Sequence, residues 1–318
     1  MTSSLDSSKQ SSRVLMMIRP ASFRMNEETA VNNGYQQDVT VANAVERAQE
    51  EFDGVVEALR RHGVQVGVYE DDESADTPDA LFPNNWVSFH ADGRVGLYPM
   101  FAVNRRRERR ESLLHSVAAD FGLEWSELVD LTEFESHGVF LEGTGSLILD
   151  RVHRVAYAAI GPRTDQQAAE QWSEVFGYGL VHFTAMQTAG DTSEPIYHTN
   201  VMLAIGTHWA VVCTDIIPDI EERNRVLKSL KSSGREIVSI TADQVNGFAG
   251  NVLEVLGGDN TPLIAMSSAA YEAFTEEQRI VLSAHAPIVH APIPTIERLG
   301  GGSVRCMLAE VFLPQIAQ

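Results

Sequence analysis

An internal repeat runs through the chain. Five segments each open with a small or polar residue, continue as an apolar strand, turn at glycine or aspartate and continue as a second strand. They begin at Asn84, Glu142, His198, Gly250 and Cys306, at intervals of roughly 52 to 58 residues. A period of this length is typical of a fold built from repeated supersecondary units.

Between these hairpins the sequence shows a helical pattern followed by a strand. In the stretch 41–62, apolar residues recur on one helical face, and the pattern stops at Gly63. Residues 64–70 then alternate as a strand. The same pattern predicts helices at 106–121, 165–176, 219–230 and 275–283, with strands at 180–185, 236–241 and 286–293. The repeating unit is therefore β-β-α-β.

The two ends of the chain complete one another in this scheme. The fifth segment, from Cys306, has no second strand after it, whereas an apolar strand at 13–20 has no hairpin partner. Pairing them would complete a fifth unit. We therefore predict an α/β fold of about five such units around a pseudo-fivefold axis. No linker divides the chain, so we expect one catalytic domain over 13–318, preceded by a disordered tail over 1–12.

Charge and composition narrow the class of function. The chain has 44 acidic and 24 basic side chains and a net charge of −20, which argues against nucleic acid or an anionic membrane as partner. The two cysteines cannot form a disulfide framework, and neither a secretory signal nor an apolar run of membrane-spanning length is present. We expect a cytoplasmic protein that acts on a small molecule; a homo-oligomer is compatible with these observations.

Repeats that radiate from an axis bring equivalent positions to a common centre. The residues that open the first strands are Asn84, Asn85, Glu142, His198, Asn251 and Cys306. This set contains a thiol, an imidazole and a carboxylate, which suffice for a nucleophile, a general acid–base and an orienting group. A lone cysteine is more often a small buried apolar residue, and Cys213 fits that interpretation. Cys306 differs because it follows a glycine-rich loop that lets the backbone approach a ligand.

These elements resemble the guanidino-group-modifying enzymes of the pentein superfamily, which are α/β propellers. Arginine deiminases, dimethylarginine hydrolases and amidinotransferases belong to it. The resemblance begins near residue 13 and extends to the C-terminus, and the elements PNNW, LEGTGS, HTN and NRRRER are most similar to the citrulline-utilisation hydrolases. It implies a five-bladed propeller, an amino acid substrate, and catalysis that requires no metal or organic cofactor.

The resemblance also implies roles for individual residues. Cys306 matches the nucleophile, His198 the acid–base histidine, and Glu142 the first acid of a Glu-Gly-Gly-Asp element. The positions that match substrate-binding residues, or neighbour them, are Asn84, Asn85, Arg105 or its neighbour Arg106, Arg163, Asn200 and Asn251. The arginines among them fall where relatives hold the α-carboxylate.

Three acids that relatives carry in the pocket are absent, since Asn85, Gly145 and Asn200 stand in their places. A guanidinium cation favours carboxylates, whereas a neutral ureido group offers a carbonyl acceptor and N–H donors that an amide can satisfy. We therefore expect hydrolysis of citrulline, or of arginine past citrulline, to ornithine through a covalent cysteine intermediate. The alternatives are an amidinotransferase, an arginine deiminase or methylarginine hydrolase, and a non-catalytic binding protein.

Overall fold

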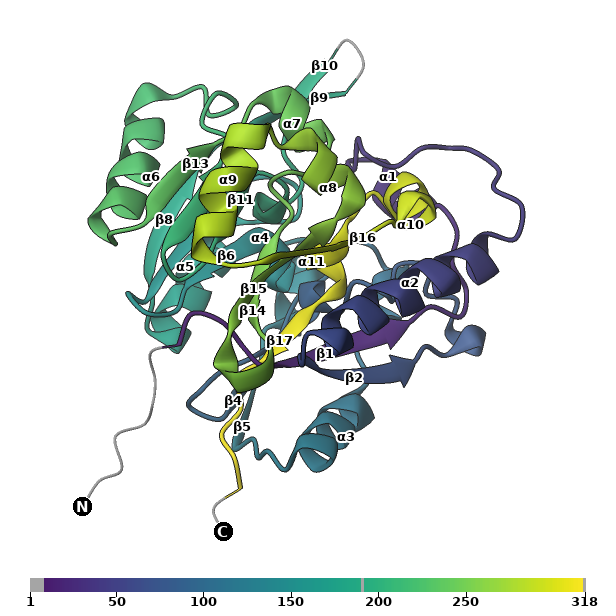
Figure 1. Cartoon of the computed structure of the whole chain (residues 1–318). Coiled ribbons are helices and arrows are strands. Elements are labelled where there is room, and N and C mark those ends of the chain that lie inside the picture. The colour runs from purple at the N-terminus through teal and green to yellow at the C-terminus, as the bar shows by residue number, and fades with distance from the viewer. Residues whose placement is uncertain (1–8, 190–191, 317–318) are drawn as a thin grey trace, which may run out of the picture.

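The computed structural model describes residues 9–189 and 192–316 (Figure 1). These residues form five three-stranded sheets and one separate hairpin. With the strands of each sheet in the order in which they pair, the sheets consist of β17 (Ala309–Val311), β1 (Val14–Arg19) and β2 (Gln65–Glu70); β3 (Val87–Phe89), β4 (Arg94–Leu97) and β5 (Glu127–Asp130); β6 (Leu147–Asp150), β7 (Val155–Ala159) and β8 (Gly179–Phe183); β11 (Leu203–Ile205), β12 (Trp209–Val212) and β13 (Glu236–Ser239); β14 (Leu253–Leu256), β15 (Pro262–Ser267) and β16 (Ile288–Ala291). The hairpin is β9 (Met186–Ala189) with β10 (Thr192–Pro195).

All five sheets share one pairing pattern. The middle strand runs antiparallel to the first strand and parallel to the third, which returns after a helix. In the sheet of β17, β1 and β2 the middle strand is β1. The N-terminal strand therefore pairs with β17 from the other end of the chain, with Val14 opposite Val311. The predicted unit and its completion by the N-terminal strand are both confirmed.

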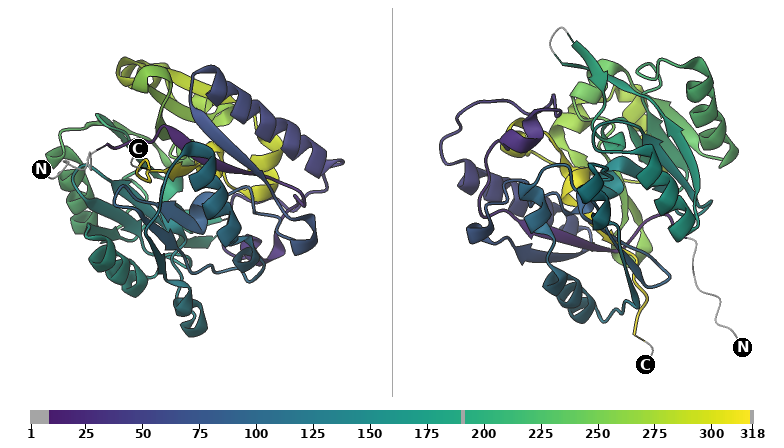
Figure 2. Two further views of the ribbon diagram at one scale, coloured as in Figure 1. Left: turned by 90° about the horizontal axis from the view of Figure 1, so that it is seen from below. Right: turned by 180° about the vertical axis from the view of Figure 1, so that it is seen from behind.

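The longer helices α2, α6 and α9 lie at the periphery of the molecule, outside the strands, whereas the short helices α4 and α11 lie among the strands (Figures 1 and 2). The described helices are α1 (Glu27–Ala30), α2 (Ala44–Arg61), α3 (Glu111–Phe121), α4 (Gly143–Ser146), α5 (Gln166–Phe176), α6 (Ile220–Ser232), α7 (Ala242–Asn246), α8 (Ser268–Ala273), α9 (Glu276–His285), α10 (Pro294–Gly300) and α11 (Val304–Met307). Helix α2 buries Phe52 and Leu59 in one apolar cluster with Leu15 and Met17 of β1. In the described part of the chain, no helix has the length and apolarity needed to span a bilayer.

Short helical turns stand where the sequence predicted the start of four first strands. They are the 3-10 turn Pro83–Asn85, helix α4, the 3-10 turn Thr199–Val201 and helix α11. Glu142 and His198 directly precede two of these turns, and Cys306 lies within the last. The predicted positions were therefore correct as repeat equivalents but wrong as strand residues. The turns interrupt the extended backbone just before the first strands β3, β6, β11 and β17.

The predicted N-terminal tail is too long by at least three residues. Gln10, Ser11 and Ser12 are buried. Gln10 donates to the carbonyl oxygen of Leu149, and Ser12 donates to that of Val311. Residues 1–8 lie outside the described residues. The physical reason is that these polar side chains have backbone partners in two sheets, which the Ser-rich composition did not reveal.

Candidate active site

One small cavity brings the predicted nucleophile and histidine together. It is lined by Asn33, Asp79, Phe82, Asn85, Arg105, Arg163, Tyr197, His198, Gly300, Gly301, Gly302 and Cys306. Its free volume of about 10 Å³ is close to that of one water-sized probe. A molecule as large as an amino acid could enter only if the lining segments moved apart.

The Cys306 sulfur is held by two amide groups. Asn200 Nδ2 donates to Sγ at 3.3 Å and Asn251 Nδ2 donates at 3.2 Å. Asn251 Nδ2 also donates to the Asn200 backbone carbonyl, which couples the two donors. The side chain of Cys306 is buried, with 3% of its surface exposed. Two N–H donors aimed at sulfur fix its position and stabilise negative charge on it.

His198 and Glu142 form a buried pair. His198 Nε2 lies 2.8 Å from Glu142 Oε2, and the other carboxylate oxygen of Glu142 accepts a hydrogen bond from the backbone N–H of Phe101 at 3.0 Å. Both side chains are almost fully buried. The predicted orienting contact between acid and imidazole is therefore present in the fold.

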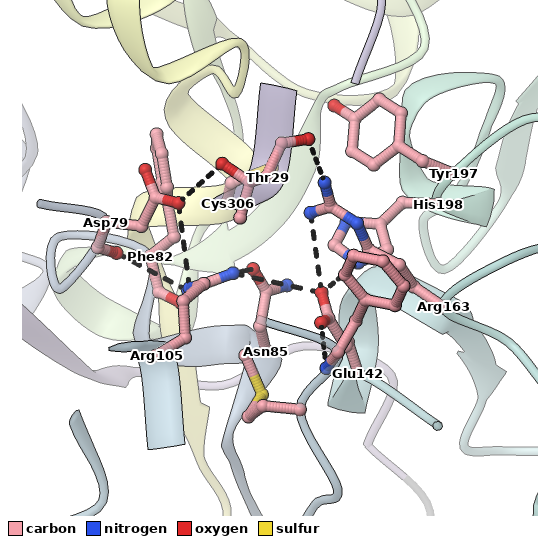
Figure 3. Close-up of polar contacts among 12 residues, drawn as sticks. Thr29, Asp79, Phe82, Asn85, Arg105, Glu142, Arg163, Tyr197, His198 and Cys306 are labelled. Carbon is pink, nitrogen blue, oxygen red and sulfur yellow. Dashed lines mark hydrogen bonds and ion pairs between the residues drawn. The ribbon is translucent and has the colours of Figure 1, made fainter. Parts of the chain in front are cut away.

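Two guanidinium groups set the charge of this pair. Burial alone would raise the pKa of Glu142, but Arg163 at 3.6 Å, His198 and Arg105 at 3.8 Å lower it to about 2. Burial lowers the pKa of His198 to about 4, against the opposing effect of Glu142. At neutral pH the carboxylate is ionised and can only accept, so Nε2 of the neutral imidazole carries the proton and Nδ1 is the free basic nitrogen. Figure 3 shows the arginine side chains beside Glu142.

Of the adjacent arginines proposed to reach the substrate, only Arg105 lines the cavity. Its Nε and Nη2 bind the two carboxylate oxygens of Glu108 at 2.8 and 3.0 Å, and Nη1 donates to Asn85 Oδ1 at 2.9 Å. Arg106 turns away, because its Nε donates to the carbonyl of Met100 and lies 3.3 Å from Glu135. Arg106 therefore does not line this cavity, whereas its neighbour Arg105 does.

The contact with Arg105 leaves the amide nitrogen of Asn85 without a partner. Asn85 is buried, and its Nδ2 has no hydrogen-bond acceptor among the described residues. A Cβ atom at Gly145 would lie 2.4 Å from that nitrogen and 2.9 Å from His198 Nδ1. The glycine that replaces the second family acid therefore makes room for the Asn85 amide.

Sequence reasoning missed Asp79. This buried residue lines the cavity, and its Oδ2 accepts hydrogen bonds from Asn26 Nδ2 at 2.8 Å and from Thr29 Oγ1 at 3.1 Å. Its Oδ1 has no donor among the described residues. A carboxylate directly before the apolar run ALF was the available signal. An unpartnered carboxylate oxygen at this point can receive a substrate ammonium group.

Arg163 is in the cavity, where two of its three guanidinium nitrogens donate hydrogen bonds and Nη1 lies 3.6 Å from Glu142. Its Nε and Nη2 bind Asn32 Oδ1 at 2.9 and 2.6 Å, and Nη2 also donates to the carbonyl of Thr29 at 2.8 Å. A carboxylate that binds Arg163 must displace this segment around α1. Asn84 does not line the cavity; its Nδ2 lies 3.4 Å from Thr144 Oγ1.

The described part of the chain contains no set of side chains suited to binding a metal ion. No group of three or more histidine, cysteine, aspartate or glutamate side chains there is arranged to hold a metal ion. The polar side chains that line the cavity with Cys306 carry amides, guanidiniums, one imidazole, one phenol and the single carboxylate of Asp79.

Solved structures share this fold. A variant of the N-terminal domain of ArgZ, covalently bound to a reaction intermediate, matches with a TM-score of 0.72 at 16% identity, covering 95% of this chain and 99% of that one. The whole of ArgZ, an arginine dihydrolase from cyanobacteria, matches with a TM-score of 0.72 at 15% identity, and the match covers 41% of its length. A dimethylarginine dimethylaminohydrolase variant, as an adduct with S-methyl-L-thiocitrulline, matches with a TM-score of 0.62 at 15% identity, covering 94% of this chain and 99% of that one.

Comparison with protein families gives a more specific result than the fold. A comparison with curated protein sequences found no match. The family described as eukaryotic N,N dimethylarginine dimethylhydrolase matches residues 19–313. This span includes Glu142, His198 and Cys306, and the resemblance to pentein guanidino-group-modifying enzymes is confirmed. The chain therefore belongs to this family and is a hydrolase that acts on carbon–nitrogen bonds other than peptide bonds.

Proposed function

We propose that this enzyme hydrolyses the ureido group of citrulline, or the guanidino group of arginine past citrulline, to give ornithine. The observation that carries the proposal is the buried Asn85 Nδ2, which lacks an acceptor in the described structure. A guanidinium has only N–H donors, whereas a ureido group has a carbonyl oxygen that can accept from Nδ2. Leaving a buried donor unpaired costs about 1–3 kcal/mol, so the site favours the substrate that supplies the acceptor.

The proposed reaction begins at Cys306. Its thiol proton passes to His198 Nδ1, and the thiolate attacks the ureido carbon, forming a carbon–sulfur bond. His198 gives the proton to the departing amine as the carbon–nitrogen bond breaks. Water, deprotonated by His198, then breaks the carbon–sulfur bond. Ornithine is the departing amine, so water converts the remaining S-carbamoyl group to carbamic acid, and His198 returns its proton to the Cys306 sulfur. Carbamic acid breaks down to ammonia and carbon dioxide, so that citrulline and one water yield ornithine, ammonia and carbon dioxide. Glu142 keeps the imidazole oriented and stabilises its positive charge.

The proposed substrate orientation uses the remaining unpaired groups. The α-ammonium group binds Asp79 Oδ1, which has no donor partner among the described residues. The α-carboxylate binds Arg163 once the Thr29 and Asn32 contacts have opened. Asn200 and Asn251 act on Cys306 rather than on substrate, because their Nδ2 atoms donate to its sulfur.

The architecture around this site extends the proposal. We infer that the five sheets are the blades of a five-bladed α/β propeller and that residues 13–318 act as one catalytic domain. Contacts of β6 with β11, of β11 with β14 and of β17 with β3 support this arrangement, since they join the first strands of different sheets. The cytoplasmic location and a homo-oligomeric state stay predictions.

A second candidate is hydrolysis of N,N-dimethylarginine. The family match favours it, and the ring of Phe82 in the cavity wall supplies an apolar surface for methyl groups. Its products would be citrulline and dimethylamine.

The deciding experiment incubates wild type, Cys306→Ala and Cys213→Ala separately with citrulline, arginine and N,N-dimethylarginine. Ammonia, dimethylamine, citrulline and ornithine are quantified by mass spectrometry. Ornithine from citrulline, retained in Cys213→Ala and lost in Cys306→Ala, supports the proposal. Citrulline that accumulates from arginine or from dimethylarginine contradicts it, and identifies a deiminase or a methylarginine hydrolase respectively. Addition of glycine as an acceptor amine tests for amidino transfer.

A further inference from the structure

A second cavity lies apart from the active site. Its volume is about 470 Å³, within the usual range for small-molecule sites, and it shares no lining residue with the active-site cavity. Residues near both ends of the described chain line it, including Arg13 and Phe312. The established class of reaction gives this cavity no role.

Its charge is opposite to that of the molecule. The chain carries 44 acidic side chains against 24 basic ones, yet no aspartate or glutamate occurs among the described residues that line this cavity. Four basic side chains line it: Lys9, Arg13, Arg151 and Arg154. A concave surface lined by charge of one sign concentrates ligands of the opposite sign.

Arg151 supplies a second, independent observation. Its side chain is buried, with 6% of the residue exposed, and its guanidinium lies over the Phe312 ring at 3.9 Å. The carboxylate that accompanies it, Glu310, is 3.8 Å away, which is an ion pair without a hydrogen bond. Within the described structure its guanidinium donates no hydrogen bond at all. Arg151 therefore has N–H donors without a protein acceptor on a side chain that lines the cavity, although only 6% of the residue is exposed.

Arg235 is a buried arginine whose guanidinium, unlike that of Arg151, has hydrogen-bond acceptors within the protein. Its Nη1 and Nη2 both donate to the carboxylate of Asp150, and its Nε donates to the carbonyl of Gly206 at 2.7 Å. Arg151 has no comparable set of acceptors. The Arg151 donors are therefore open to an acceptor from outside the protein.

Arg154 lines the same cavity as Arg151. Its guanidinium lies over the Tyr178 ring at 4.0 Å and donates to the carbonyl of Phe176. Contacts with ring faces orient the planar groups of Arg151 and Arg154 while leaving N–H edges for a ligand. Planar guanidiniums bind phosphate and carboxylate oxygens in a bidentate manner.

We propose that this cavity binds a small, multiply charged oxyanion, with Arg151 and Arg154 as its principal ligands and Arg13 at the more exposed edge. Phosphoryl compounds and polycarboxylates share the required chemistry. The site is separate from the proposed hydrolysis of citrulline and does not depend on it.

The test measures binding of pyrophosphate and, separately, of citrate by isothermal titration calorimetry at an ionic strength fixed with sodium chloride. Wild type is compared with Arg151→Gln and with Arg225→Gln, a control in which the lost charge is on the exposed face of α6, 3.6 Å from Glu222. We expect at least one probe to bind wild type and Arg225→Gln equally, and to bind Arg151→Gln about 10-fold more weakly or worse. Binding of pyrophosphate but not citrate would identify a phosphoryl ligand, and binding of citrate but not pyrophosphate would identify a polycarboxylate.

Two outcomes overturn the proposal: neither probe binds folded wild type, or Arg151→Gln binds as wild type does. Melting curves establish that each variant is folded. If Arg151→Gln fails to fold, Arg154→Gln takes its place in the comparison, with the same expected loss of affinity.

Discussion

Arg105 donates from Nη1 to Asn85 Oδ1 at 2.9 Å, and this contact decides which way the Asn85 amide faces. Because the oxygen is occupied, the nitrogen must point toward Gly145, where a Cβ atom would lie only 2.4 Å away. An asparagine held by an arginine therefore presents a donor to the site, whereas an aspartate at the same position would present an acceptor.

Asn85→Asp should shift substrate preference from citrulline toward arginine. The aspartate retains the acceptor for Arg105 but replaces the Nδ2 donor with a charged oxygen. We expect kcat/KM for citrulline to fall at least about 10-fold, and the ratio of arginine to citrulline kcat/KM to rise. Using the ratio separates specificity from a general loss of activity; an unchanged ratio would refute the role given to Nδ2.

The amide donors to sulfur should control the reactivity of Cys306. Removing one donor with Asn251→Ala should slow both turnover and alkylation of Cys306 by iodoacetamide about 10-fold, because a hydrogen bond to a charged group is worth roughly 1.5–3 kcal/mol. Alkylation is followed by mass spectrometry of the Cys306 peptide. Asn246→Ala, at the end of α7 and without a contact to sulfur, is the matched control. Equal alkylation rates in both variants would count against the idea.

Gly145 should tolerate no side chain. Gly145→Ala places a methyl group against Asn85 and His198, and we expect it to lower stability by about 1–3 kcal/mol and to reduce kcat. Gly54→Ala is the control, because a Cβ there meets nothing within 4 Å and lies within helix α2. That variant should gain up to about 1 kcal/mol. Urea unfolding measures both changes, and a Gly145→Ala protein as stable as wild type would show that the site is looser than described.

The buried imidazole should make stability depend on pH. His198 has its pKa lowered from 6.5 to about 4, so the unfolded chain binds its proton first as pH falls. Its contribution to stability is therefore complete above about pH 6.5 and is lost on the way down to about pH 4. Between pH 7 and pH 5 we expect wild type to lose about 2 kcal/mol more than His198→Gln does. Parallel urea titrations at the two pH values give the difference, and equal losses would contradict the assigned direction.

Substitution of Arg105 should reduce activity far more than substitution of its neighbour Arg106. Arg105→Gln removes the bidentate contact with Glu108 and the hydrogen bond to Asn85, so activity should fall by about 100-fold or more. Arg106→Gln removes a contact with Glu135 outside the cavity and should leave kcat/KM within about 3-fold of wild type. A larger loss for Arg106→Gln in a steady-state assay would reverse the assignment.

Local patterns in the sequence were sufficient to predict the repeated β-β-α-β unit. Apolar periodicity located α2, and an unpaired strand at each end of the chain predicted the sheet that joins β17 to β1. Residues at equivalent repeat positions then identified Glu142, His198 and Cys306 as neighbours of one centre, as the structure places them.

Contacts that depend on side-chain direction could not be predicted in this way. Asn200 and Asn251 were expected at the substrate, and the sequence did not indicate that their Nδ2 atoms donate to the sulfur of Cys306. Asn200 lies in the 3-10 turn Thr199–Val201, which periodicity did not predict. Asp79 belongs to no repeat position, so periodicity could not select it. The choice between Arg105 and Arg106 likewise required the direction of each side chain along one short 3-10 turn, Asn104–Glu108.

The pairing of β1 with β17 has a consequence for the order of biosynthesis. Strand β1 is made first and can pair with β2 early, but its other edge stays open until β17 has left the ribosome. Helix α11, which carries Cys306, lies immediately before β17. The nascent polypeptide therefore acquires Cys306 together with the strand that covers the open edge. A chain stalled before that point would lack Cys306 and expose an aggregation-prone edge at the same time.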